Sequence, residues 1–290
     1  MLTSNKKPNY LSIYVHWPFC LAKCPYCDFN SHVRTNIDQT EWTKAYIKSL
    51  KFWKENLPEF VVDTIFFGGG TPSLMKDRTV YEILQNIHNL WKITPEVEIT
   101  LEANPTSTEK ETFSSYRCSG VNRLSLGVQA FHDADLKRLG RLHNSKEAKE
   151  AIGVATNLFK RVSFDLMYGR QYQTLSNWEK ELQTAIEFST EHLSLYQLTI
   201  EKGTRFGDLL SKNKLRGLPN DVRSRNFYIN TQDICEASGL QAYEISNHAI
   251  FGKECRHNIN YWNSGCFLGI GPGAHGRLNI GLERFRTEAP

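Results

Sequence analysis

The stretch "LSIYVHWPFCLAKCPYCDFN" (11–30) joins an apolar run typical of a buried β-strand to a loop with three cysteines, Cys20, Cys24 and Cys27. Pro18 and Pro25 keep the cysteine segment out of regular helix. The chain's four other cysteines stand singly along the sequence. The end of this first strand is therefore a candidate metal or catalytic site.

The composition is that of an ordinary soluble protein. With 290 residues, 40% hydrophobic and 23% charged, the chain is long enough for one large α/β domain or two small ones. It shows no secretory leader and no apolar run long enough to span a bilayer, so we expect a cytoplasmic protein without stable membrane insertion. In that reducing compartment, clustered cysteines favour metal binding or catalysis over disulfides. A net charge of +4, with acidic and basic residues interleaved, gives no indication of a nucleic-acid partner.

Short β-branched or aromatic runs alternate with longer segments of helical period. The predicted strands are 11–17, 61–69, 96–104, 122–129, 161–169 and 192–200. The clearest predicted helices are 38–56, 77–91, 145–159 and 176–188, the last with a capping box from Ser176 to Glu179. Strict alternation predicts an α/β fold, a partial (β/α)6 barrel with parallel strands and the helices outside.

Each predicted strand is followed by a polar or glycine-rich group. In barrels of this kind, ligands collect at the carboxyl ends of the strands, so these groups are expected to line one cavity. In strand order they are the cysteines, "GGGTP" (68–72), Glu102, Gln129, Asp165 and Thr199.

Three thiolates without a fourth are unusual for a closed zinc site, which takes four protein ligands. A [4Fe–4S] cluster held by three cysteines keeps one iron free for another ligand. That iron can chelate the amino and carboxylate groups of S-adenosylmethionine, and the cluster can then pass an electron that splits the cofactor into methionine and a 5′-deoxyadenosyl radical. The alternative is an incidental group of buried cysteines.

The spacing C-x-x-x-C-x-x-C after a first barrel strand resembles the radical S-adenosylmethionine superfamily. The blocks "FFGGGTPSLM" (66–75), "LEANP" (101–105), "RLSLGVQ" (123–129), "LGRLHN" (139–144) and "YEISN" (243–247) resemble the branch that contains oxygen-independent coproporphyrinogen III oxidase and its relatives, the heme chaperones. The resemblance covers roughly residues 10–280.

The resemblance implies a set of cofactor residues. Cys20, Cys24 and Cys27 would be the cluster ligands, the glycine-rich turn would offer backbone N–H groups to the methionine part of the cofactor, and Glu102 would bind the ribose hydroxyls. The implied S-adenosylmethionine contacts are Tyr14, Tyr26, Gly69, Gly70, Thr71, Glu102, Gln129, Arg141 and Asp165.

Two activities compete within this branch. The oxidase uses the radical to decarboxylate porphyrinogen propionates, whereas the chaperone binds heme and delivers it to heme-requiring membrane or respiratory proteins. In the oxidase the motif continues to a further cysteine, but Phe29 occupies that position here, and only nineteen residues precede Cys20. Both differences favour a heme chaperone over the oxidase.

The stretch "ECRHNINYW" (254–262) matches the HNxxYW heme motif associated with the chaperones. It implies His257 as an axial heme ligand, with Tyr261 and Trp262 on the porphyrin and Arg256 at a propionate. A buried structural histidine is the plainer reading of His257 alone. Alternative ligands are Cys255, Cys266 and His275.

The sequence departs from the family pattern at three places. "RQYQT" (170–174) replaces a Leu-Pro-Gly-like turn, His248 replaces an aromatic residue, and the chain ends at Pro290, before the C-terminal helical domain expected in this family. We therefore predict a lead at 1–10, the barrel at 11–210, and a truncated C-terminal region at 211–290. A shortened member that binds a cluster but no longer transfers heme is a third possibility.

Overall fold

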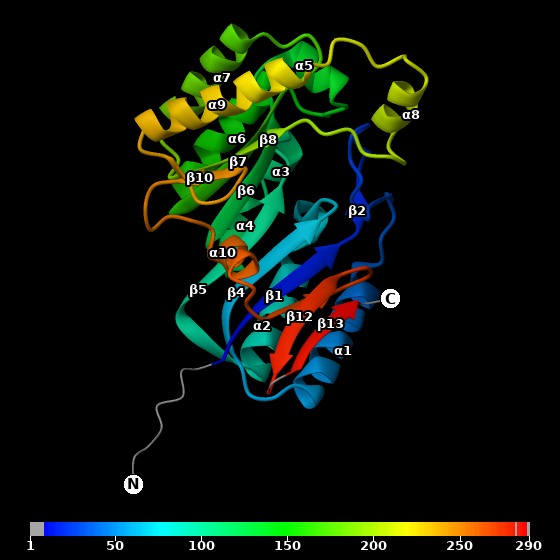
Figure 1. The fold of residues 1–290 in the computed structure, drawn as a ribbon. Helices are drawn as coiled ribbons and strands as arrows, with labels where there is room; N and C mark the ends of the chain where they lie inside the picture. The colour runs from blue at the N-terminus through cyan, green and yellow to red at the C-terminus, as the bar shows by residue number, and fades with distance from the viewer. Residues whose placement is uncertain (1–8, 282, 289–290) are drawn as a thin grey trace.

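An eleven-stranded sheet organises the chain in the computed structural model, which describes residues 9–281 and 283–288 (Figure 1). Six neighbouring strands at its centre are parallel, and they confirm the six predicted ones. They are β1 (Tyr10–Trp17), β4 (Val61–Gly69), β5 (Lys92–Ala103), β6 (Arg123–Gln129), β7 (Arg161–Tyr168) and β8 (His192–Gln197). Most of the predicted lead, residues 1–8, lies outside the described residues.

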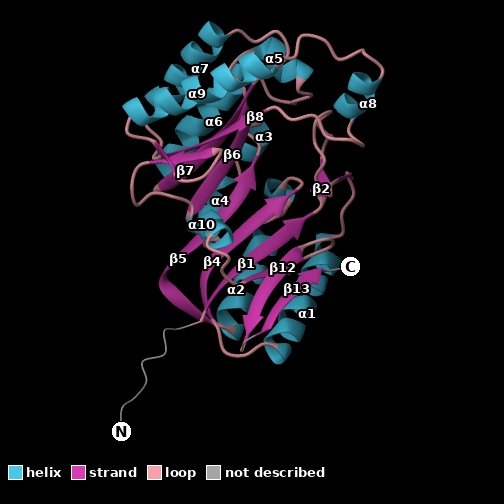
Figure 2. Ribbon diagram, viewed as in Figure 1, coloured by secondary structure: helices cyan, strands magenta, loops and turns pink. Residues whose placement is uncertain are grey.

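Helices follow the strands and cover the outside of the sheet (Figure 2). They are α1 (Gln39–Asn56), α2 (Asp77–Leu90), α3 (Ser107–Lys110), α4 (Phe113–Cys118), α5 (Asp133–Arg138), α6 (Ser145–Leu158) and α7 (Leu175–Glu187). The predicted capping box from Ser176 to Glu179 is wrong, because α7 begins one residue earlier and its N-cap is Thr174. The Thr174 hydroxyl accepts a hydrogen bond from the Asn177 N–H at 3.2 Å.

The strands place apolar side chains on the outer face of the sheet and polar ones on the inner face. On β1, Leu11, Ile13 and Val15 are fully buried in the same core as Tyr46 and Leu50 of α1. Residues between them face the other way, since successive side chains alternate along a strand. The interior of the partial barrel is therefore lined by polar groups.

The elements after residue 210 extend the same sheet at both edges. At one edge, β11 (Phe267–Ile270) pairs in parallel with β1, and β12 (His275–Ile280) and β13 (Glu283–Glu288) follow in antiparallel order. At the other edge, β10 (Asn247–Ala249) and β9 (Gln241–Ala242) follow β8. Along the chain, α8 (Arg205–Ser211) and α9 (Asp221–Ala237) lie between β8 and β9, and α10 (Arg256–Trp262) connects β10 to β11. Within the described ranges, no helix combines the length and apolar character that crossing a bilayer requires.

Candidate functional site

A cavity of about 360 Å³ opens at the carboxyl ends of the parallel strands. The three cysteines lie on its wall, together with the glycine-rich turn after β4 and polar side chains from β5, β6 and β7. Its volume lies within the usual range for small-molecule sites. Of the predicted cofactor residues, the lining includes Tyr26, Gly69, Gly70, Thr71, Glu102, Gln129, Arg141 and Asp165.

Tyr14 does not border this cavity. Its hydroxyl lies 3.0 Å from His16 Nδ1, and its ring stacks near Phe66 with the ring centroids 6.3 Å apart. A Cβ added at Gly68 would lie 2.9 Å from the Tyr14 ring, so this tyrosine packs beneath the glycine-rich turn.

The cysteine loop is folded by its own hydrogen bonds. Its first residues form β2 (Phe19–Cys20), which pairs with β3 (His32–Val33) on the far side of the loop. Within the loop, the Cys27 N–H donates to the Cys24 carbonyl at 3.1 Å. Lys23 Nζ donates to the carbonyls of Phe29 at 3.3 Å and Ser31 at 3.2 Å. All three thiols are half-buried and free.

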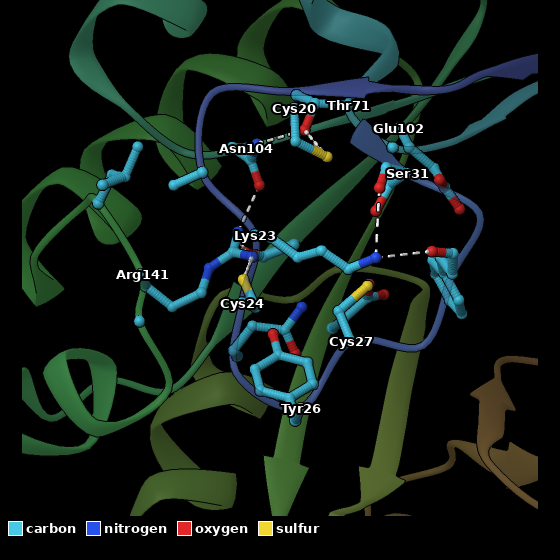
Figure 3. A pocket seen from close by; sticks show the side chains of 18 of the residues that line it. Cys20, Lys23, Cys24, Tyr26, Cys27, Ser31, Thr71, Glu102, Asn104 and Arg141 are labelled. Atoms are coloured by element: carbon cyan, nitrogen blue, oxygen red, sulfur yellow. Dashed lines mark hydrogen bonds between the residues drawn. The ribbon is translucent and has the colours of Figure 1, made fainter. Parts of the chain in front are cut away.

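A chain of hydrogen bonds connects two of the three thiols through side chains from distant motifs (Figure 3). Thr71 Oγ1 donates to Cys20 Sγ at 3.5 Å, and Asn104 Nδ2 donates to Thr71 Oγ1 at 3.3 Å. Arg141 donates to Asn104 Oδ1 and, through Nη1, to Cys24 Sγ at 3.4 Å. Such donors orient thiolate ligands and favour the ionised sulfur.

Two further observations fit a bound group at this cavity. Arg141 Nε and His143 Nδ1 are buried without a hydrogen-bond partner among the described residues, although both side chains line the cavity. Burial raises the pKa of the Cys27 thiol, and the neighbouring Cys24 and Cys20 raise it further. A positively charged centre between the three sulfurs would relieve that repulsion, as an iron–sulfur cluster does. Asn104 and His143 were missed as site residues, although "LEANP" and "LGRLHN" contain them.

The glycine-rich turn differs from the expectation that its N–H groups are free. Gly70 N–H donates to the Trp17 carbonyl at 2.7 Å, and Thr71 N–H donates to the Phe19 carbonyl at 2.8 Å. A Cβ at Gly70 would lie 2.6 Å from the Phe19 carbonyl oxygen, so only glycine allows the turn to pack against the cysteine loop. The turn thus uses the N–H groups that were expected to bind the cofactor to hold the cysteine loop in place.

Two half-buried carboxyl groups, Glu102 and Asp165, lie on the wall of the cavity. Burial raises the pKa of Glu102 to about 8, and the charge of Asp165 adds to this, although a hydrogen bond from the Gly69 N–H opposes it. Burial also raises the pKa of Asp165 to about 6, although the positive charges of Arg123 and Arg141 oppose this rise. Groups with such shifts are frequent in binding sites, because a ligand can supply the missing partners.

The "RQYQT" segment (170–174), which departs from the family pattern, stabilises the wall of the cavity. Arg170 is buried and ion-paired with Glu181 and with Asp135 Oδ2, the latter at 3.3 Å. Its Nη1 donates to the Gln129 carbonyl at 3.3 Å. Gln129 has a φ of +70°, a left-handed conformation that costs energy for a residue with a side chain. Arg170 therefore holds a strained residue of the cavity wall in position.

The HNxxYW segment forms α10, which lies away from the cysteines. Glu98 and Glu102 are both on β5 and point to the same face, because four residues separate them along the strand. Glu98 accepts hydrogen bonds from the N–H groups of Arg256 at 3.3 Å and His257 at 3.2 Å, at the start of α10. Helix α10 thus closes the inner face below the cavity.

The His257 ring has both nitrogens in hydrogen bonds. Nδ1 lies 2.7 Å from Thr64 Oγ1, and Nε2 lies 2.8 Å from the Tyr261 hydroxyl. The residue is buried, and burial lowers its pKa to about 3, with a contribution from Arg123. As placed, His257 has no nitrogen available to a metal, and its role as a heme ligand stays a prediction.

The other predicted heme residues are spread around α10. Trp262 is 58% exposed, whereas the Tyr261 ring packs edge-on against Phe267 with the ring centroids 4.5 Å apart. Arg256 is ion-paired with Asp63. Burial raises the pKa of the Cys255 thiol to about 11. Cys266 is half-buried and His275 is exposed.

The chain is similar to several known proteins. The sequence model of the Radical SAM superfamily matches residues 14–185. The heme chaperones HemW of Haemophilus influenzae and Escherichia coli are each 40% identical to the chain, over 93% of its length and 71% of theirs. The mitochondrial radical S-adenosyl methionine domain-containing protein 1 of Bos taurus is 36% identical, over 92% of the chain and 60% of its own.

The solved structures include a similar fold. The coproporphyrinogen III oxidase HemN of Escherichia coli superposes with a TM-score of 0.79 at 21% identity, over 94% of this chain and 66% of the oxidase chain. This likeness confirms the predicted fold class, a mostly parallel sheet with helices outside.

Proposed function

The chain belongs to the radical SAM superfamily and, within it, to the family of the heme chaperone HemW, and on this basis we propose that it binds heme and transfers it to heme-accepting proteins. What supports this most is the 40% identity to two bacterial heme chaperones over 93% of the chain. The chain spans 71% of the length of those relatives and 66% of the oxidase. The activity of the full-length relatives is therefore proposed for this chain.

Membership of the superfamily implies a [4Fe–4S] cluster and S-adenosylmethionine. Cys20, Cys24 and Cys27 would hold the cluster, and the fit rests on their common cavity and on the donors that reach two of the thiols. When bound, the cluster supplies a low-potential electron and one iron with an open coordination position. In this proposal the thiolates stay oriented by Thr71 and Arg141.

S-adenosylmethionine would occupy the rest of the cavity. The N–H groups of Gly70 and Thr71 are already in use, so the turn that includes Gly69 would meet the cofactor's amino group through backbone carbonyl oxygens. Glu102 would accept hydrogen bonds from the ribose hydroxyls, and Asp165 would lie beside Glu102. The remaining predicted contacts are Tyr26, Gln129, Arg141 and, beneath the turn, Tyr14.

Heme would be the cargo, and membrane-bound or respiratory proteins that require heme would be its acceptors. His257, Tyr261 and Trp262 are the heme contacts that the motif implies. For His257 to bind iron, its ring would have to leave Thr64 and Tyr261.

An oxygen-independent coproporphyrinogen III oxidase is the alternative. The solved oxidase shares the fold at 21% identity, which carries no activity with it. Phe29, at the position of the oxidase's additional cysteine, is 60% exposed beside the three thiols and supplies no fourth sulfur. This residue favours the chaperone.

The test is an anaerobic titration of the cluster-reconstituted chain with hemin, followed by the Soret band. Stoichiometric binding, and transfer of the bound heme to an apo-acceptor, are expected. In parallel, coproporphyrinogen III is incubated with the chain, S-adenosylmethionine and reductant, and no protoporphyrinogen should form. Absence of heme binding together with decarboxylation would replace the chaperone by the oxidase.

A further inference from the structure

Ser125 on β6 lines the cofactor cavity, although it is not among the cofactor contacts that the family resemblance implies. Its side chain is on the inner face of the sheet, between its register partners Glu102 on β5 and Ser163 on β7. The residue is 8% exposed. Ser125 is therefore a polar side chain that the protein encloses at the wall of the cavity.

The space between Ser125 and the cavity is kept open by a glycine. Gly127 is two residues further along β6, so it occupies the same face, and it also lines the cavity. A Cβ at Gly127 would lie 3.3 Å from Gln129 Nε2 and 3.4 Å from Arg141 Nη2, so a larger residue would crowd the cavity wall. Because glycine has no side chain, a ligand in the cavity can approach the Ser125 hydroxyl.

A buried arginine fixes the direction of the hydrogen bonds at Ser125. Arg123 Nη2 donates to Ser163 Oγ at 2.7 Å, and the Ser163 hydroxyl donates to Ser125 Oγ at 3.0 Å. A guanidinium group only donates and is not deprotonated in proteins. Ser163 therefore accepts from Arg123 and directs its own proton to Ser125.

This order of donors leaves the proton of Ser125 unused. Within residues 9–281 and 283–288, Ser125 Oγ accepts from Ser163, and no group accepts the Ser125 proton. Neighbouring strands are about 4.8 Å apart, so this donor lies one strand spacing from the Glu102 carboxyl group, which is an acceptor when ionised. The cavity wall thus presents a donor and an acceptor side by side.

A hydroxyl group of the ligand matches this pair, because a hydroxyl both donates and accepts. An ammonium group only donates, so it would leave the Ser125 proton unpaired. A carboxylate only accepts, and the charge of Glu102 would repel it. Among the polar groups of S-adenosylmethionine, the ribose hydroxyls are therefore the ones that satisfy both residues.

We propose that Ser125 is a further S-adenosylmethionine-binding residue, and that its hydroxyl donates to the oxygen of a ribose hydroxyl group that itself donates to Glu102. Ser163 and Arg123 are positioning residues, because they set the direction of the Ser125 hydroxyl and do not line the cavity themselves. The inference rests on the proposed function, since it adds a contact to the same cofactor site.

The test measures the S-adenosylmethionine affinity of the full, cluster-reconstituted chain by equilibrium dialysis at pH 9, above the pKa of Glu102 at about 8. Ser125→Ala should weaken binding about three- to tenfold, the range of one neutral hydrogen bond. Ser12→Ala is the matched control, because Ser12 is a buried serine that accepts from Thr64 and does not line the cavity. It should bind the cofactor as the wild type does.

Two analogues separate a direct contact from a structural effect. The dialysis is repeated with 2′-deoxy and 3′-deoxy S-adenosylmethionine. The wild type and Ser125→Ala should bind equally well the analogue that lacks the hydroxyl contacted by Ser125. An equal loss for all three ligands, or no loss for any of them, would overturn the inference.

A second variant tests the positioning role with Ser125 in place. Ser163→Ala should weaken binding by less than Ser125→Ala does, and it should cause no further loss when it is combined with Ser125→Ala. A further loss in the double variant would contradict a role that acts through Ser125. If the wild type itself binds no S-adenosylmethionine, the proposed cofactor site fails instead.

Discussion

Replacing His257 with Phe should lower the free energy of unfolding by about 2–4 kcal/mol, because the imidazole secures α10 inside the barrel. The substitution removes the hydrogen bonds to Thr64 at 2.7 Å and to Tyr261 at 2.8 Å. Thr64 keeps its bond to Ser12 Oγ at 2.7 Å, whereas the Tyr261 hydroxyl loses the partner it has here. Each lost buried bond costs about 1–3 kcal/mol when its partner stays unsatisfied, and the Phe ring retains much of the packing.

The effect should also depend on pH, with a sign set by the lowered pKa of His257. The folded pKa is about 3, and the unfolded one is about 6.5. The stability contributed by the neutral ring is present above the unfolded value and is lost as the pH falls from there toward the folded value. Between pH 7.5 and 5 the wild type should lose about 2 kcal/mol that His257→Phe does not lose.

Urea unfolding of the apo-chain, followed by circular dichroism at pH 7.5 and pH 5, measures both effects. The matched control is His88→Ala, an exposed histidine whose removal should change the free energy of unfolding by less than about 0.5 kcal/mol. The structural role would be refuted if His257→Phe unfolded like the wild type at pH 7.5. Loss of heme binding by that stable variant would then make His257 the ligand that the motif implies.

Three further outcomes test the cofactor cavity. Cys24→Ala should abolish the broad iron–sulfur absorption after anaerobic reconstitution; an unchanged spectrum would exclude Cys24 as a ligand. Because the pKa of Glu102 is raised to about 8, S-adenosylmethionine binding should strengthen about tenfold from pH 7 to pH 9, and Glu102→Gln should remove that dependence; equal slopes in equilibrium dialysis would contradict the ribose role. Asn104→Leu should keep the cluster but shift its midpoint potential downward, because Thr71 and Arg141 lose their shared partner; an unmoved potential in an EPR titration would contradict this.

The six strands and the site at their ends could be predicted from sequence for a physical reason. Strand period and helix period differ, and alternation of the two places every strand's carboxyl end on one side of a parallel sheet. A group such as Asp165 could therefore be assigned to the cavity from its position in the chain alone. The start of α7 at Leu175 was not predicted, because the Ser176 to Glu179 pattern pointed to a later cap than Thr174, the N-cap that the structure has.

What the sequence did not reveal depends on pairs far apart in the chain. Arg141 and Cys24 are separated by 117 residues, and His257 and Thr64 by 193. No local pattern encodes such contacts, so Asn104 was not predicted to be a site residue. The motif that suggested a heme ligand at His257 likewise gave no sign that Thr64 would reach its ring.

Inside this barrel, the hydrogen-bond and ion-pair partners of a side chain distinguish a structural group from a ligand-binding one, and its position on the strand does not. Glu98 and Glu102 lie on the same strand and face the same way; Glu98 is buried, and Glu102 is half-buried at the wall of the cavity. Glu98 is matched by Arg161 at 2.8 Å and by two N–H groups of α10, so its charge is balanced within the protein. Glu102 has the Gly69 N–H but faces Asp165, and its pKa rises to about 8. A carboxylate that lacks partners within the protein is stabilised when a ligand supplies hydroxyl donors. The level of the barrel at Glu102 is therefore suited to ligand binding, whereas the level at Glu98 stabilises the fold.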